Sequence, residues 1–281
     1  MVDSVIGTLR EFTKKAKPVS KFVKNIYTRG ISLESRVPVV VYQMGKVGSK
    51  SIEKSLRNRG IHPLYHVHRI NPYYIKNVMD VKKKRGLDIF DRKDIEGLLL
   101  YDEIIRRSKK SKFISTIREP VSRNISAFFE RFVGVEGWNG PTNPDLIVES
   151  FLEEYNHEVP LTWFDKEPKN TLGIDVYEKS FPCEKGYVQL KKGPFELLVV
   201  RIDIADKKKE KIIKSFIGID KFEIERKNMG NKKSYSNVYK RVKEKASLPS
   251  CYLEKMLQSK YTQHFYNEEE IKKIFDKWSK K

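Results

Sequence analysis

Cysteine is scarce in this chain, which has only two among its 281 residues, Cys183 and Cys251. Two cysteines are too few for a disulfide framework, and their spacing matches no metal motif of the CxxC type. Such sparing use of cysteine fits a reducing compartment. The sequence therefore predicts a cytoplasmic protein without a metal site.

Long apolar runs are missing as well, and residues 1–36 hold no stretch long enough for a secretory signal or a membrane span. Within them Val5, Leu9 and Phe12 recur at helical spacing, and basic residues follow. The pattern predicts a basic N-terminal extension over 1–36 that could form an amphipathic helix. We expect this helix to pack on the core. Peripheral contact with a membrane surface is the alternative.

Acidic residues are outnumbered, 37 against 57 lysines and arginines, which gives a net charge of +20. Such a field attracts polyanions, for example acidic glycans, nucleic acid or phosphorylated nucleotides. No helix-turn-helix, zinc-finger or aromatic RNA-binding pattern is visible, so we expect no specific nucleic acid partner. A non-enzymatic protein that binds polyanions or nucleic acid remains an alternative. The sequence does not set the oligomeric state.

Apolar runs typical of buried strands alternate with helical patterns along the rest of the chain. This alternation predicts an α/β fold, a three-layer sandwich with a mostly parallel central sheet, as a single domain over 37–281. Loops over 81–92 and 134–170 are expected to build the pocket for the substrate. The expected strands are 37–43, 64–68, 112–118, 173–177 and 196–202.

The most informative stretch is VVVYQMGKVGSKSIEKSL at 39–56, a buried strand, a loop with two glycines, and a helix pattern. Backbone N–H groups of such a loop and the helix dipole together favour a bound phosphate. The stretch is not a GxxxxGKS/T kinase loop, because Gly48 is followed by Ser49 and not by lysine.

The run KVGS at 46–49 resembles the K-x-G-S/T loop of sulfotransferases, which binds 3′-phosphoadenosine 5′-phosphosulfate (PAPS). The resemblance implies a sulfotransferase-like fold with a P-loop-like phosphate-binding loop. It also implies that Lys46 contacts the leaving phosphate and the sulfonate. Gly48, Ser49, Lys50 and Ser51 would hold the 5′-phosphate.

A second motif begins at Arg118, which ends the predicted strand 112–118, and Ser126 stands eight residues later. In sulfotransferases an arginine and a serine at this spacing bind the 3′-phosphate of PAPS. The surrounding R-D/E-P-x-x-R pattern is similar to that of carbohydrate sulfotransferases. A guanidinium fork and a hydroxyl suit a phosphate group. The alternative for Arg118 is a structural ion pair.

The run YHVH at 65–68 resembles a segment of hexuronic-acid 2-O-sulfotransferases, in which histidine is the catalytic base. Histidine has a suitable pKa for removing a proton from a sugar hydroxyl. Alternation along a strand places His66 and His68 on the same face. We expect one of them to act as the base, with a slight preference for His66. Glu119 and Glu53 are the alternatives.

Segments at 163–165, 173–182 and 228–233 resemble a bacterial family of capsular polysaccharide synthesis proteins that is sulfotransferase-like. Lys232 and Lys233 would then contact the 3′-phosphate, although a solvated basic turn explains them as well. Trp163 could stack on a sugar, or it could be a core residue. Arg69 could meet an acidic sugar, or it could be solvated.

Together these resemblances imply an enzyme that transfers a sulfonate group from PAPS to a hydroxyl of a carbohydrate, a capsular or surface glycan or its precursor. No metal is required. A Mg-ATP-dependent kinase is the alternative, with Asp203 at the end of VVRID as the nearest match to an acidic metal ligand after an apolar strand.

Overall fold

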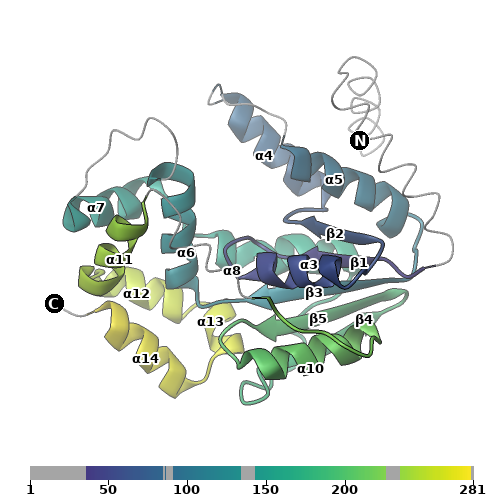
Figure 1. Ribbon diagram of the computed structural model, residues 1–281. Coiled ribbons are helices and arrows are strands. Elements are labelled where there is room, and N and C mark those ends of the chain that lie inside the picture. Colours follow the sequence, from purple (N-terminus) through teal and green to yellow (C-terminus); the bar gives the residue numbers. More distant parts are fainter. Residues whose placement is uncertain (1–35, 85, 87–90, 134–142, 226–234, 280–281) are drawn as a thin grey trace.

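A computed structural model describes residues 36–84, 86, 91–133, 143–225 and 235–279. Its centre is a five-stranded sheet with the order β2-β1-β3-β5-β4, in which only the edge strand β4 is antiparallel to its neighbour. The predicted α/β fold with a mostly parallel sheet is therefore confirmed (Figure 1). The strands are β1 (Val39–Tyr42), β2 (Leu64–Val67), β3 (Ser111–Ile117), β4 (Tyr187–Lys192) and β5 (Phe195–Arg201).

Strand β1 is buried on both faces because successive side chains point to opposite sides of the sheet. Val39 and Val41 face one apolar cluster, and Val40 and Tyr42 face another. Helices must therefore cover both faces, which gives three layers.

Two helices cover the first face, α3 (Ser49–Asn58) and α10 (Asp206–Ile217), and they lie on the same side of the sheet in Figure 1. Ile52 and Leu56 of α3 and Ile213 of α10 are buried against the sheet. Ile52 and Leu56 are four residues apart and therefore lie on the same side of α3.

The opposite face is covered by a larger set of elements. Leu100, Ile104, Trp163 and Phe265 pack there in one cluster with Tyr42. The elements are α4 (Pro72–Lys84), α5 (Arg92–Leu100), the π-helical turn η2 (Tyr101–Ile105), α8 (Val159–Phe164), the π-helical turn η4 (Asp165–Lys169), α9 (Asn170–Leu172) and α13 (Lys260–Phe265).

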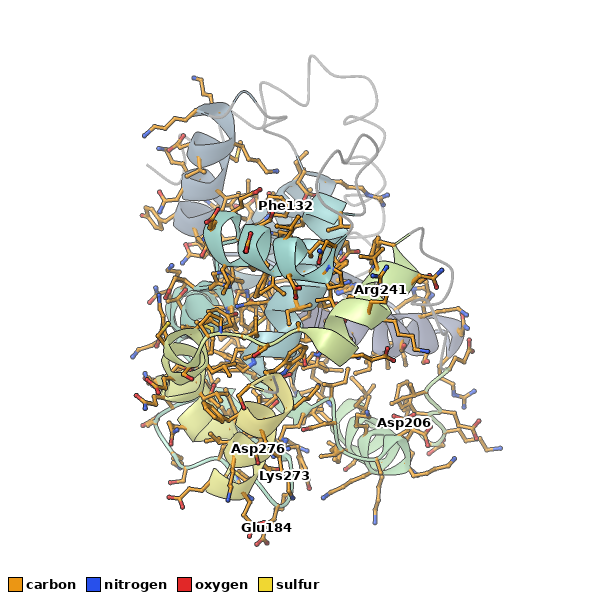
Figure 2. The ribbon with its side chains drawn as sticks, turned by 90° about the vertical axis from the view of Figure 1, so that its left-hand side faces the viewer. Phe132, Glu184, Asp206, Arg241, Lys273 and Asp276 are labelled. Carbon is orange, nitrogen blue, oxygen red and sulfur yellow. The ribbon has the colours of Figure 1, made fainter. Side chains whose placement is uncertain are left out.

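A second apolar cluster lies beside the sheet and is formed by helices alone, with Phe128 and Trp278 fully buried. Figure 2 views the molecule from this side, with Arg241 on α11 and Lys273 and Asp276 on α14, all three exposed. The helices are α6 (Pro120–Phe128), the π-helical turn η3 (Phe129–Val133), α7 (Pro144–Glu154), α11 (Ser236–Lys245), α12 (Ser250–Leu257) and α14 (Glu268–Trp278).

Three sequence predictions need correction. Residues 173–177 form no strand, because Gly173 ends α9 with a φ of 69° and the chain then turns. The strand beside β5 is instead β4, which the sequence did not reveal because it is half-exposed and polar. The expected loops over 81–92 and 134–170 are largely helical where they are described, since α4 continues to Lys84 and α7 and α8 follow Asn143.

Two predictions lie outside the described residues, the extension over 1–35 and the lysines Lys232 and Lys233. In the part of the chain that the structure describes, no helix has both the length and the apolar character that crossing a membrane requires.

Candidate functional site

The loop between β1 and α3, residues 43–48, has an unusual backbone. Gly45, Lys46 and Gly48 have φ values of 87°, 63° and 75°. Lysine rarely adopts this left-handed conformation, and such strain is concentrated at functional sites. Gly48 allows no side chain, because a Cβ there would lie 1.6 Å from Ile202 Cδ1.

Helix α3 begins at Ser49 directly after this loop, and Gly48 is its N-cap without any capping side chain. The first N–H groups of a helix have no partner within the helix, and a side-chain cap usually satisfies one of them. A helix N-terminus without a side-chain cap can hold an anion on its free N–H groups.

Two arginines donate hydrogen bonds to backbone carbonyl groups of this loop. Arg118 Nη1 donates to the Lys46 carbonyl at 3.2 Å. Arg123 donates from Nε to the Gly45 carbonyl at 3.2 Å and from Nη2 to the Met44 carbonyl at 3.0 Å. Three successive carbonyl oxygens are thus engaged on one side, which stabilises the strained backbone.

Arg123 is fully buried, and its remaining nitrogen Nη1 donates at 2.9 Å to both Asn124 Oδ1 and Tyr155 Oη. Burial lowers the pKa of the guanidinium, which still remains charged at neutral pH. In the sequence this arginine is only the second arginine of the R-D/E-P-x-x-R pattern. Its role depends on a loop almost eighty residues earlier, which no local pattern reveals.

An acidic residue that sequence reasoning missed lies at the loop. Glu130 Oε2 is 2.6 Å from Lys46 Nζ, and Glu130 Oε1 is 3.7 Å from Lys50 Nζ. Glu130 belongs to η3, about one helical turn after Ser126 on the preceding α6. The loop lysines and the helix that carries Ser126 therefore meet at this carboxylate.

The half-buried Ser51 lies in the first turn of α3.

His66 on β2 uses both of its ring nitrogens within the protein. Gln43 Nε2 lies 2.9 Å and Ser49 Oγ 3.1 Å from His66 Nε2, which must therefore accept. His66 Nδ1 then carries the proton and faces Glu53 Oε2 at 3.3 Å. This bond lowers the pKa of Glu53 to about 2, while burial lowers the pKa of His66.

His68 has the same tautomer as His66, but its partners differ. Its Nδ1 lies 2.9 Å from the Gln43 carbonyl oxygen and 3.1 Å from the Gln43 side-chain nitrogen. Since a carbonyl can only accept, Nδ1 carries the proton and Nε2 has the free lone pair. Lys93 Nζ is 3.3 Å from that Nε2. Burial and, next, the charge of Lys93 lower the pKa of His68 to about 3.

The backbone that follows β2 is fixed from α8 and η4. Trp163 Nε1 donates to the His68 carbonyl at 2.9 Å, and its ring is 2% exposed. Glu167 accepts from the Ile70 and Asn71 N–H groups at 2.8 and 3.1 Å. Trp163 is therefore a core residue that positions His68, and it presents no face on which a sugar could stack.

Two further candidates have structural partners. Arg69 forms a two-pronged ion pair with the buried Asp94, at 2.7 and 2.9 Å, so it is neither solvated nor open to a ligand in this state. Glu119 caps α6, and both of its carboxylate oxygens accept from the Ser122 N–H at 3.0 Å.

The acid considered for a kinase is also engaged. Asp203 accepts from Arg201 at 2.9 and 2.7 Å, and Arg201 bonds Glu270 as well. Within the described ranges, no group of three or more histidine, cysteine or acidic side chains could hold a metal ion.

Comparison with known proteins gives one family. Residues 143–267 match the family model described as "Putative capsular polysaccharide synthesis protein". No curated protein and no solved structure gives a significant match to the chain. The matched segment is less than half of the chain and suggests a glycan-related role. It includes Trp163 and Glu167, whereas the β1–α3 loop, both histidines, Arg118 and Ser126 precede it.

Proposed function

We propose that this protein is a sulfotransferase that transfers a sulfonate group from PAPS to a hydroxyl of a glycan or glycan precursor. The observation that carries the proposal is the β1–α3 loop. Its carbonyl groups are held by Arg118 and Arg123, and Lys46 and the uncapped N-terminus of α3 stand beside it. The matched capsular polysaccharide family supports a glycan as the acceptor.

The residues present fit a phosphorylated donor. Helix α3 starts at the loop without a side-chain cap, and two lysines, Lys46 and Lys50, stand there with their ammonium groups at Glu130. Gly48, Ser49, Lys50 and Ser51 would hold the 5′-phosphate, and Lys46 would also contact the sulfonate. Arg118 and Ser126 would hold the 3′-phosphate, with Lys232 and Lys233 as further proposed contacts.

When bound, PAPS supplies an activated sulfonate whose bond to the phosphate breaks as the acceptor oxygen attacks the sulfur. The contribution of the protein is positioning and electrostatic stabilisation of the charge that develops on the leaving phosphate. Of the two histidines, His68 is better placed as the base, because Nε2 of His66 is held by Gln43 and Ser49, at 2.9 and 3.1 Å. Nε2 of His68 instead faces the end of the Lys93 side chain, at 3.3 Å. His68 Nε2 would take the proton of the acceptor hydroxyl.

Calorimetric titration with adenosine 3′,5′-bisphosphate, without metal, tests the donor assignment. We expect tight binding that Arg118→Ala weakens at least tenfold. Arg107→Ala is the matched control, since Arg107 is exposed and precedes β3, at the end of that strand opposite to Arg118. Lys46→Ala is expected to lower the transfer rate about a hundredfold, the typical effect of removing one transition-state contact, while Lys110→Ala leaves it unchanged.

A titration with ATP and Mg²⁺ runs in parallel. Binding of ATP only with the metal would contradict the proposal and favour a kinase. Binding of neither nucleotide, together with salt-sensitive binding to DNA, would favour a protein that binds polyanions without catalysis.

A further inference from the structure

Lys93 stands out because none of the sequence motifs includes it, yet it contacts the best-placed base. It lies in the first turn of α5, where the helix dipole disfavours a positive charge. Among the described residues Lys93 forms no ion pair, although the chain offers carboxylates to many of its lysines. Its ammonium group is instead directed to the lone pair of His68 Nε2 at 3.3 Å.

This contact blocks the atom that catalysis needs. The proton on Nδ1 is fixed by the Gln43 carbonyl, so Nε2 is the only nitrogen of His68 that can accept a proton. A lysine that donates to Nε2 occupies the same lone pair that a hydroxyl group would use. The acceptor-free protein therefore holds its base in an inactive arrangement.

The other groups near His68 do not draw Lys93 away from Nε2. The His66 ring lies edge-on at 5.6 Å between centroids, and Arg69 is held by Asp94. The hydrogen bond of Trp163 goes to the backbone carbonyl of His68. Lys93 is the charged side chain within hydrogen-bonding distance of the His68 ring in the described part of the chain. Burial and then the charge of Lys50 lower the pKa of Lys93, against the opposing charges of Asp91, Glu53 and Glu96.

We propose that Lys93 makes His68 depend on an acidic acceptor: a carboxylate of the acceptor sugar attracts the ammonium group of Lys93 away from Nε2 and thereby releases the base. This inference rests on the proposed function and adds the class of acceptor to it. The freed Nε2 accepts the hydroxyl proton while the hydroxyl oxygen bonds to sulfur. The bond from sulfur to the bisphosphate breaks, and the bisphosphate leaves with the electron pair.

The ionisation of His68 gives the first test. The chain has five histidines, so the ring resonances of the full-length protein, labelled with ¹³C-histidine, can be assigned with His68→Gln. We expect His68 to remain neutral far below the usual histidine pKa, as the burial and the lysine contact require. In Lys93→Met its titration midpoint should move upward, while Lys93→Arg and Lys110→Met leave it in place. An unchanged midpoint in Lys93→Met would overturn the proposal.

The second test uses sodium glucuronate and glucose as probes at pH 7, without nucleotide. Glucuronate should shift the His68 resonance and glucose should not, and Lys93→Met should abolish the difference whereas Lys93→Arg preserves it. Equal responses to the two sugars, or no response to glucuronate, would refute the role of Lys93. Because these probes need no donor, failure to bind adenosine 3′,5′-bisphosphate would refute the proposed function separately.

Discussion

Glu130 Oε2 lies 2.6 Å from Lys46 Nζ, so a carboxylate from η3, the turn that follows α6, neutralises the lysine of the β1–α3 loop. The same carboxylate faces Lys50. Both lysines are proposed to contact the anionic donor, and Glu130 therefore competes with that donor for them.

The variant Glu130→Gln should bind adenosine 3′,5′-bisphosphate about two- to fivefold more tightly, because a partly exposed ion pair contributes up to about 1 kcal/mol. Calorimetry at constant ionic strength measures the change. Glu153→Gln on the exposed side of α7 is the control, and it should leave the affinity unchanged. Weaker binding in Glu130→Gln would mean that Glu130 supports the loop and does not compete with the donor.

Gly48→Ala should destabilise the protein through two separable effects. The left-handed backbone costs about 1–2 kcal/mol for a residue with a Cβ, and the overlap with Ile202 adds about 1–3 kcal/mol. Gly60→Ala is a matched control, because Gly60 has a φ of 76° and nothing within 4 Å of a Cβ. In urea unfolding, Gly60→Ala should lose only the free energy that the left-handed backbone costs.

The Ile202→Ala background separates the two costs further. There the substitution of Gly48 by alanine should cost no more than Gly60→Ala does. A full penalty in this background would show that the side chain of Ile202 is not what excludes a Cβ.

Arg123→Met should cost about 3 kcal/mol or more, because it leaves the carbonyls of Met44 and Gly45 without their donors. Nucleotide affinity should fall as well, although Arg123 is fully buried and touches no ligand in our proposal. Urea unfolding and calorimetry on the same preparations give both values, with Arg107→Met as the control. Normal affinity in a folded Arg123→Met would show that the loop keeps its shape without this arginine.

Stability should depend on pH through Glu167. Burial raises the pKa of this carboxyl to about 7, against an ordinary value of 4.5, and Oε1 has no hydrogen-bond partner among the described residues. Between these pH values the unfolded chain releases the proton and the folded protein keeps it. The free energy of unfolding therefore falls as pH rises from 4.5 to 7, by about 1.4 kcal/mol per pH unit for one proton.

Glu167→Gln keeps an oxygen that can accept from Tyr42 and from the Ile70 and Asn71 N–H groups. Its stability relative to the wild type should increase by about 3 kcal/mol between pH 4.5 and 7. Urea unfolding at a series of pH values measures this difference. For the control Glu153→Gln, the difference in stability from the wild type should be the same at every pH. If the stability difference between Glu167→Gln and the wild type did not change with pH, the pKa of Glu167 in the folded protein would have its ordinary value.

Much of the fold could be predicted because the central strands are buried on both faces. Such strands are continuous apolar runs, and β1, β3 and β5 were placed within one or two residues. The start of α14 is likewise marked in the sequence by the capping box of Asn267 and Glu270, since both partners of a cap are local. Where a strand is half-exposed, as β4 is, the pattern disappears and the prediction failed.

The candidate site was predicted only where its residues stand in a local motif. Lys46, Gly48 and Arg118 follow strands and could be found in this way. Glu130 and Lys93 could not, because their contacts join elements distant in the sequence. Nor could the sequence distinguish the two histidines. The difference lies in their contacts with Gln43, which meets His66 at Nε2 and His68 at Nδ1 and precedes both by more than twenty residues.

The contact between Gly48 and Ile202 has an evolutionary consequence. Ile202 belongs to the segment that matches the family, whereas Gly48 lies well before it. A relative that keeps a long aliphatic side chain at the position of Ile202 can keep this loop only with glycine opposite. The two positions should therefore change together when relatives are aligned. Such covariation would mark which relatives retain the loop even where their overall similarity has faded.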